Sequence, residues 1–401
     1  MLLTAALTLA VAAPGYRVVF PDDYPGGPPG PPALALDAVS VPLPAGAEAD
    51  RWCAEALAEG EPVLLPAQAS KLGPWDDGHG WIGFLRSFEG HGDVIARPLA
   101  LAEDDVETPY AWKLEERDGA VVFLLDGREL FSYVFQDRLR EGVSERFRRN
   151  SYIHPIRSPG GVVLTDDFPP DHDWHSGLFW RWPRMVWNGK TYNEWEFGGP
   201  TDRFEEWLSR EEGPVCAVLG ARCGWYVEGE RVADEEVWIR AWPVLGQGYA
   251  IDLALCIKAS GDGLSIGGAV PDKGYGGVSV RMAPREGGVV SLPTGPQADA
   301  YQVEGAWADY SGRFAGSTEP AGIAFWPTAG LPGPAAGWFL RNYGLVGEAW
   351  PGLDTAPVPT DEPLTIRTRV WVHEGDANTG AVSEAYASWR SLRGAALAPT
   401  W

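Results

Sequence analysis

Short apolar runs, separated by turn residues, dominate the chain from about residue 36 onward. Residues 112–117, 120–125 and 129–135 form three such runs, and Asp-Gly pairs at 118–119 and 126–127 separate them. Asp-Gly between apolar runs is the strongest short-range signal for a β-hairpin. The pattern therefore predicts a three-stranded meander over residues 112–135.

Further alternation of apolar and polar positions predicts strands at 237–242, 249–257, 278–282 and 364–373. In the last of these, side chains alternate between two faces. One face is apolar, and the other carries Arg367, Arg369, Trp371 and His373. We expect that second face to be exposed to solvent or to line a cleft.

Helical patterns are few: residues 202–210 and 382–392 are the two candidates. No repeat of 20–50 residues is visible, which disfavours a propeller or a solenoid. The 50 Gly and 35 Pro fit many short strands joined by turns. Together these patterns predict an all-β protein, a large antiparallel β-sandwich with few short helices.

The ends of the chain differ from its middle. Residues 1–13 are apolar and end in Ala-Ala, which indicates a signal peptide and a periplasmic or extracellular protein; a cytoplasmic protein with a misassigned start is the alternative. Residues 14–35 are rich in Pro and Gly and predict a linker. Residues 36–401 then form the β-sandwich domain, within which 36–135 could be a smaller β region.

The net charge of -23 makes nucleic acid a poor partner, because the chain repels phosphate backbones. No other segment is long and apolar enough to cross a membrane, so no integral membrane contact is expected. The sequence leaves the oligomeric state open. If the chain is exported, Cys216 and Cys223 could form a local disulfide; buried free thiols are the alternative.

The most informative stretch is residues 152–180, which holds three of the six His of the chain. His172 and His175 lie beside Asp171 in a Pro- and Asp-rich turn, and His154 precedes them. Imidazole beside carboxylate suits acid/base chemistry. A metal site and hydrogen-bonded turn caps are the two alternatives. We expect no cofactor, although a metal is not excluded.

Two later stretches add cations and phenols. Lys273, Tyr275 and Arg281 lie in a glycine-rich turn that leads into a strand, and Arg341 and Tyr343 share one side of an extended segment. The first stretch is either a plain glycine-rich turn or one that places a cation beside a substrate carboxylate or hydroxyl. Arg341 either holds a substrate oxygen or pairs with an Asp, for which Asp309 is a candidate. A basic cluster at 138–149 predicts a solvated turn; the alternative is that one or two of its Arg reach the site.

The chain resembles the bacterial family known as DUF6807, which also carries the label methane oxygenase PmoA. The resemblance spans most of residues 36–395 and rests on four ordered motifs: RRNSYIHPIRSPGGVVLTDDFPPDH at 148–172, KGYGGVSVRM at 273–282, WADYSG with GIAFW at 307–326, and WFLRNYGL at 338–345. Members look similar to the galactose-mutarotase superfamily, which implies a supersandwich that binds a sugar across a concave sheet.

The family pattern, Asp-His-x-His followed by Gly, is matched here by Asp171, His172 and Gly177. Trp174 occupies the place of the second His, and His175 follows one position later. The resemblance therefore implies a site role for His172 first. His154, Lys273, Arg281, Arg341 and Tyr343 are the next residues to which a role transfers.

Three functions follow as hypotheses. The first is a carbohydrate-processing enzyme of lyase, hydrolase or epimerase type, in which His172, His175 and Tyr343 are catalytic. In it, Asp171, His154, Lys273, Tyr275, Arg281 and Arg341 bind a sugar or oligosaccharide. The second is a non-catalytic carbohydrate-binding protein, for which the 20 Trp would supply stacking surfaces. The third is a metal-dependent oxygenase, as the family label implies.

Overall fold

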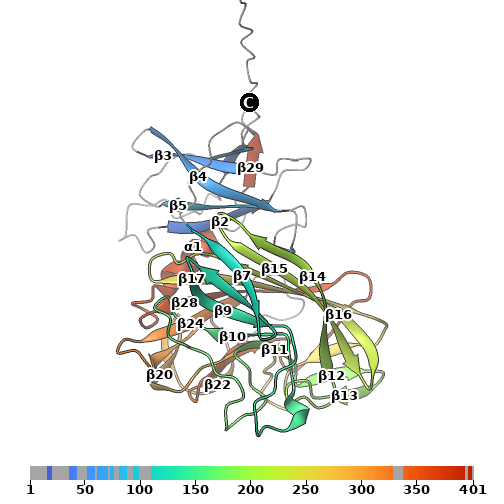
Figure 1. Ribbon diagram of the computed structural model, residues 1–401. Helices are drawn as coiled ribbons and strands as arrows, with labels where there is room; N and C mark the ends of the chain where they lie inside the picture. Colours follow the sequence, from blue (N-terminus) through green and yellow to red (C-terminus); the bar gives the residue numbers. More distant parts are fainter. Residues whose placement is uncertain are drawn as a thin grey trace, which may run out of the picture.

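A computed structural model describes residues 16–19, 36–42, 52–58, 61–70, 73–75, 81–87, 94–98, 110–327, 337–392 and 396–399. Within these ranges nearly all regular structure is antiparallel β-sheet (Figure 1). The described helices are α1 (Val382–Leu392) and the single 3₁₀ turn η1 (Glu145–Phe147), and none of them is long and apolar enough to cross a membrane. The predicted all-β class is confirmed.

Two nine-stranded sheets face each other and form the sandwich. The first, here called the site sheet, contains in spatial order β22 (Ala300–Val303), β25 (Gly337–Arg341), β26 (Leu345–Ala349), β19 (Gly277–Arg281), β11 (Leu178–Arg181), β10 (Tyr152–Ile156), β9 (Arg128–Val134), β8 (Ala120–Leu125) and β7 (Trp112–Arg117). Its last three strands are the predicted meander, and positive φ at Asp118 and Gly119 fits the expected hairpin turn.

The second nine-stranded sheet, here called the opposing sheet, contains β14 (Thr201–Glu212), β15 (Ala217–Val227), β16 (Glu230–Ala241), β17 (Gly248–Ala259), β28 (Leu364–Glu374), β24 (Ala321–Pro327), β23 (Ala308–Phe314), β20 (Arg285–Leu292) and β21 (Gly295–Gln297). The strands predicted at 237–242, 249–257, 278–282 and 364–373 and the helix at 382–392 are confirmed.

Two smaller sheets complete the described part of the structure. One contains β13 (Lys190–Tyr192), β12 (Arg184–Trp187), β18 (Ser265–Gly267) and β27 (Thr355–Pro357). The other lies at the top of Figure 1 and contains β2 (Leu36–Pro42), β5 (Trp81–Ser87), β4 (Glu61–Ser70), β3 (Trp52–Ala58), β6 (Val94–Pro98), β1 (Tyr16–Val19) and β29 (Ala396–Pro399).

The segments called signal peptide and linker are only partly described. Residues 1–13 lie outside the described residues. Within 14–35, Tyr16–Val19 form β1, which pairs with β29 and β6. The seven-stranded sheet also reaches the sandwich, because Gln68 Oε1 accepts a hydrogen bond of 2.9 Å from the backbone N–H of Cys216.

The main core lies between the site sheet and the opposing sheet. Large buried side chains from both sheets meet there, among them Trp180, Trp225 and Tyr249, each completely shielded from solvent. Burial of this kind contributes roughly 25 cal/mol per Å² of apolar surface. The apolar face of β28, including Val370, belongs to this core as the alternation predicts.

On the polar face of β28, Arg369, Trp371 and His373 are buried and Arg367 is half-buried, so the expectation that this face is exposed or lines a cleft is wrong for three of the four residues. Trp371 belongs to a second core, to which α1 contributes Val382. Arg369 donates to Asp252 at 2.8 Å, and the His373 Nε2–Asp309 Oδ1 distance is 2.8 Å. Around Arg369 and His373 the opposing sheet is therefore covered on both faces, and these two residues are paired.

The helix predicted at 202–210 is wrong, because these residues lie in the edge strand β14. The register with β15 shifts twice, between Phe204 and Glu206 and between Trp207 and Ser209. Each bulge adds one residue, so Phe204 and Trp207 both pack against the main core, with ring centroids 4.5 Å apart. The two bulges thus imitate the three-residue spacing of an amphipathic helix.

A disulfide between Cys216 and Cys223 is likewise excluded. Both thiols are free and buried. Successive side chains of β15 point to opposite faces, and the two positions differ by an odd number of residues. Cys216 accordingly packs in the second core, whereas the Sγ of Cys223 faces Tyr133 inside the sandwich.

Candidate functional site

The loop between β10 and β11 carries both His172 and His175. It closes through tight backbone turns, with hydrogen bonds of 2.9 Å from His172 N–H to Pro169 O and from His175 N–H to His172 O. Gly177 ends the loop with a φ of +46°, and a Cβ there would lie 2.2 Å from Ile153 O. Only glycine fits at this position, so the backbone path of the loop is fixed.

Arg149 ties this loop to the site sheet. Its completely buried guanidinium donates to the backbone oxygens of His175 at 2.7 Å and Asp173 at 2.8 Å, and to Asp167 Oδ1 at 2.9 Å. Asp167 also accepts from the Tyr152 hydroxyl at 2.7 Å. The basic cluster at 138–149 is therefore not solvated throughout, since Arg149 reaches the base of the loop.

Four aromatic rings form a stack along the loop. The centroids of His172 and His175 lie 4.6 Å apart with an interplanar angle of 7°, and those of His172 and Tyr343 lie 5.0 Å apart at 9°. Phe179 continues the stack behind His175 at 5.9 Å. On the far side, the guanidinium of Arg281 lies 5.0 Å from the Tyr343 ring centroid. Residues from three distant segments are thus held in one column.

Electrostatics distinguish the two imidazoles. His172 is partly exposed, and its Nδ1 lies 3.0 Å from Asp171 Oδ2. Burial lowers the pKa of His175 well below its ordinary value, and the neighbouring His172 and Arg281 lower it further. His175 is therefore neutral at neutral pH, and its buried Nδ1 has no hydrogen-bond partner among the described residues.

The carboxylate of Asp171 stays ionised. Burial alone would raise its pKa, but hydrogen bonds from Arg281 at 2.7 and 2.8 Å, together with His172, lower the pKa of Asp171 to about 2. Burial raises the pKa of Tyr343 to about 12. At neutral pH, Asp171 is thus an acceptor beside the imidazole, and Tyr343 keeps its proton.

The column opens onto a cavity of about 160 Å³. Six of the nine site residues expected from the sequence line it: His172, His175, Lys273, Tyr275, Arg341 and Tyr343. Asp171 and Arg281 lie directly behind them, in contact with His172 and Tyr343. The cavity is smaller than the roughly 300–1,000 Å³ typical for drug-sized ligands, so its size suits one small ring.

His154 lies apart from the cavity. Its Nδ1 is 3.0 Å from Thr165 Oγ1, and burial lowers its pKa to about 4. Arg341 pairs with Asp299 at 3.3 Å and also contacts the Tyr301 hydroxyl. The expected pairing of Arg341 with Asp309 is therefore wrong, because Asp309 is bound to His373.

The sequence did not single out five further lining residues: Trp195, Glu196, Tyr301, Phe339 and Leu345. Trp195 and Tyr275 are in ring contact, with centroids 5.0 Å apart, and Phe339 lies 5.3 Å from Tyr275. The signal that could have found Trp195 and Tyr301 is weak: each is an aromatic residue set among polar neighbours near a short strand.

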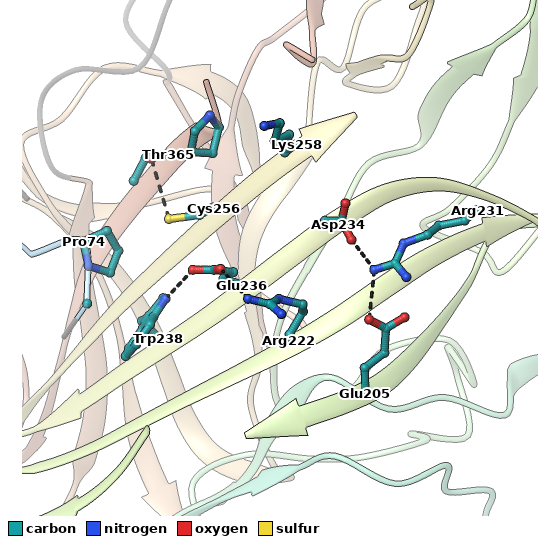
Figure 2. Close-up of a pocket in the computed structure, with 12 residues that line it drawn as sticks. Pro74, Glu205, Arg222, Arg231, Asp234, Glu236, Trp238, Cys256, Lys258 and Thr365 are labelled. Carbon is teal, nitrogen blue, oxygen red and sulfur yellow. Dashed lines mark hydrogen bonds and ion pairs between the residues drawn. The ribbon is translucent and has the colours of Figure 1, made fainter. Parts of the chain in front are cut away.

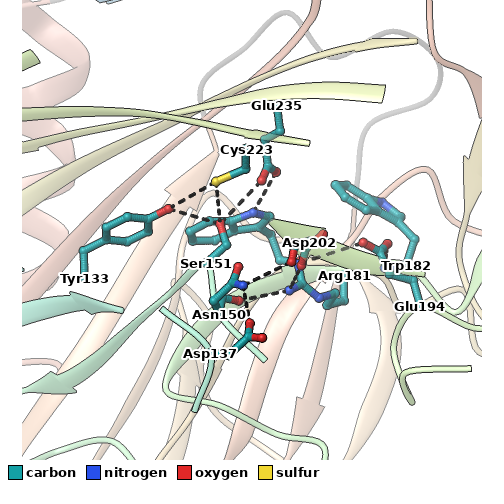
Figure 3. Close-up of polar contacts among 11 residues, drawn as sticks. Tyr133, Asp137, Asn150, Ser151, Arg181, Trp182, Glu194, Asp202, Cys223 and Glu235 are labelled. Atoms are coloured by element: carbon teal, nitrogen blue, oxygen red, sulfur yellow. Dashed lines mark hydrogen bonds and ion pairs between the residues drawn. The ribbon is translucent and has the colours of Figure 1, made fainter. Parts of the chain in front are cut away.

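A buried polar network supports the cavity wall (Figure 3). Glu194, next to Trp195 in the chain, lies 3.9 Å from Arg181 and accepts from the Trp182 backbone N–H at 3.1 Å. Arg181 also pairs with Asp202. Burial raises the pKa of Glu194 and of Asp202. Because Glu194 is tied to β11 in this way, the position of Trp195 is fixed from behind.

A larger cavity of about 880 Å³ lies on the outer face of the opposing sheet, against Pro74 (Figure 2). Its charged residues are mostly satisfied by one another: Arg231 pairs with Glu205, and Arg222 pairs with Glu236. Burial raises the pKa of the Cys256 thiol to about 11, so this group is not a nucleophile at neutral pH. The smaller cavity is therefore the better candidate site.

Among the described residues, no group of three or more His, Cys, Asp and Glu side chains is placed to hold a metal ion. His172 and Asp171 are adjacent and His175 stacks on His172, but the other neighbours of this group are Arg281, Trp174 and Tyr343. A cation and aromatic rings are not metal ligands of the usual kind.

The fold and cavity define a two-sheet β-sandwich protein with a histidine-bearing pocket on one sheet. The chain belongs to DUF6807, a family of unknown function, whose model matches residues 120–387. That range includes every residue lining the cavity.

Comparison with solved structures gives a putative aldose 1-epimerase from Klebsiella pneumoniae, with 7% identity and a TM-score of 0.21 over 90% of this chain and 96% of that chain. A score of this size does not by itself establish a shared fold, so the β-sandwich rests on the sheets described above. No curated protein sequence matches the chain.

Proposed function

We propose that this chain is a carbohydrate-processing enzyme that moves protons on a small sugar bound beside His172. The observation that carries the proposal is the convergence of imidazole, phenol, ammonium and guanidinium groups from residues 172–175, 273–275 and 341–343 on one cavity. Groups of these types, set among aromatic walls, suit a polyhydroxylated ring whose faces are apolar and whose edges are polar.

His172 is the proposed acid/base residue. Asp171 lies beside Nδ1 of the ring, so a proton on Nδ1 is favoured and Nε2 keeps a lone pair. That nitrogen would take a proton from a ring carbon or hydroxyl and return it to the product. Asp171 would orient the imidazole and stabilise its charged form, as carboxylates do beside catalytic histidines.

The neighbours of His172 have separate tasks. His175 is neutral and in ring contact with His172. His172 can therefore gain and lose a proton without a second imidazolium ion stacked against it. Tyr343 keeps its proton and would donate a hydrogen bond to a sugar oxygen. Trp195 and Tyr275 would pack against a ring face.

One experiment tests the proposal and sorts the reaction types. Purified protein is incubated in D₂O with a panel of mono- and disaccharides, and proton NMR follows the mixture. Epimerisation at carbon replaces a carbon-bound proton with deuterium, elimination removes that proton with the leaving group and forms a double bond, and hydrolysis releases a sugar without exchange at carbon. The proposal predicts one of these changes in wild type and its loss in His172→Phe. Sugar binding by the wild type with neither change would overturn it.

A second candidate is a non-catalytic carbohydrate-binding protein. It is favoured by the aromatic share of the cavity lining, since Trp174, Trp195, Tyr275, Tyr301 and Phe339 all line it. In that case Trp195→Ala abolishes sugar binding while His172→Phe changes it little. Calorimetric titration of both variants with a sugar that binds the wild type separates the two functions.

Export of the protein is proposed together with this function. It rests on the apolar run at residues 1–13, which has the composition of a signal-peptide core. Expression of the whole chain with a C-terminal tag, followed by fractionation and N-terminal sequencing, tests it. Recovery of uncleaved protein in the cytoplasm would count against export.

A further inference from the structure

We infer that the ligand of this cavity is an acidic sugar, with a carboxylate held at Lys273. The inference rests on the proposed function, because it names the class of sugar that the same cavity would take. It starts from the charges at the cavity lining, where two cations, Lys273 and Arg341, face one carboxylate, Glu196. The two imidazoles are not counted among these charges, because His175 is neutral and His172 gains and loses a proton in the proposed reaction.

Lys273 is the cation without a carboxylate partner. No Asp or Glu of the described part of the chain lies within 4.0 Å of its Nζ, which instead lies 5.7 Å from the ring centroid of Tyr301. Arg341, in contrast, is occupied by Asp299 and by the Tyr301 hydroxyl. An ammonium group at the rim of a cavity and without a protein partner is free to bind an anionic group of a ligand.

A protein of net charge -23 repels anions at long range, so whether an anion binds in the cavity depends on the charges close to it. Salt screens charges beyond about 8 Å at physiological ionic strength, whereas a carboxylate at Lys273 would lie within contact distance. The small cavity volume also favours a single ring with its acidic group at the rim over a longer chain.

The exposure of the other lining residues fits a sugar acid whose carboxylate points toward solvent. His175 and Phe339 are completely buried at the closed end, and Lys273 and Glu196 are exposed at the rim. A sugar acid would place its hydroxyl-bearing ring toward the histidines and its carboxylate toward solvent, so the charge is never fully desolvated.

Calorimetric titration with two matched pairs, glucose against glucuronate and galactose against galacturonate, tests the inference on the whole chain. Within each pair only a CH₂OH group is replaced by a carboxylate. One ion pair at the rim is expected to make the uronate bind about tenfold more tightly than its neutral partner. The preference should shrink when salt is raised from about 50 mM to about 500 mM.

Three variants sharpen the result. Lys273→Met should abolish the preference, and Glu196→Gln should enlarge it. Lys258→Met, an exposed lysine on the opposing sheet, is the matched control and should have no effect. Neutral sugars that bind as tightly as the uronates would overturn the inference while the proposed function stands. If no sugar of either kind binds, the proposed function falls and the inference falls with it.

Discussion

His172 and His175 stack face to face, with ring centroids 4.6 Å apart and an angle of 7° between the rings. Two imidazolium ions at this separation would repel each other strongly, so the pair carries at most one charge near neutral pH. Burial decides which ring stays neutral, because it lowers the pKa of His175 while His172 remains partly exposed. The stack therefore supports the proposal that His172, and not His175, is the acid/base residue.

The first prediction separates the chemistry of His172 from its packing. His172→Phe keeps an aromatic ring against Tyr343 but cannot transfer a proton. We expect turnover of any sugar converted in the D₂O assay to fall by about 10²–10⁴-fold, with little change in the midpoint of urea unfolding. His172→Ala should lose turnover equally and also lower the midpoint. Retention of turnover in His172→Phe would exclude His172 as the acid/base residue.

The second prediction concerns the pH dependence of the Asp171 ion pair. In the folded protein the pKa of Asp171 is lowered to about 2, whereas an unfolded Asp has a pKa of about 4. Its contribution to stability is therefore fully present above about pH 4 and is lost as the pH falls toward 2. Urea unfolding of wild type and Asp171→Asn should differ at pH 6 and converge on acidification. A difference that widens at low pH would contradict this sign.

The sequence pointed to six of the residues that line the cavity, but it did not predict the sheet edges. The Asp-Gly turns at 118–119 and 126–127 act locally, so the meander could be read from neighbouring residues alone. The bulges of β14 depend on pairing with β15, which no local pattern reveals, and a strand was taken for a helix. Long-range pairing also hid Asp299 as the partner of Arg341, because the sequence pattern pointed to Asp309 instead.

The third prediction concerns Arg149, the anchor of the histidine loop. Arg149→Met leaves Asp167 nearly buried without its cation, and removing one partner of a buried pair costs about 3–5 kcal/mol. The double variant Arg149→Met with Asp167→Asn should recover part of that loss. Urea unfolding of all three proteins gives the coupling energy between the two side chains.

The neighbouring Arg148 provides the matched control. It pairs with Glu145 in an exposed position, so Arg148→Met should change the free energy of unfolding by about 0–1 kcal/mol. If Arg149→Met is no more costly than this control, then Arg149 does not hold the loop.

The fourth prediction concerns Glu348, a carboxyl group buried in the site sheet. It accepts a hydrogen bond of 2.6 Å from Thr368 Oγ1, and no cation of the described residues pairs with it. Burial raises the pKa of Glu348 to about 7, so the folded protein holds a proton that the unfolded chain releases above about pH 4.5. The sign is the reverse of that for Asp171: stability falls as the pH rises from about 4.5 to about 7 and is level above.

Glu348→Gln keeps the shape and the acceptor oxygen but cannot ionise. At pH 8 it should therefore be more stable than wild type, by up to about 3 kcal/mol for a pKa shift of this size, and the difference should vanish near pH 4. Thr368→Val is the complementary variant, because it removes the hydroxyl donor and should destabilise the wild type at every pH. Urea unfolding between pH 4 and 8 measures both. A Glu348→Gln variant that is less stable at pH 8 would show that the ionised carboxylate is satisfied in the folded protein, which requires a donor or cation in addition to Thr368.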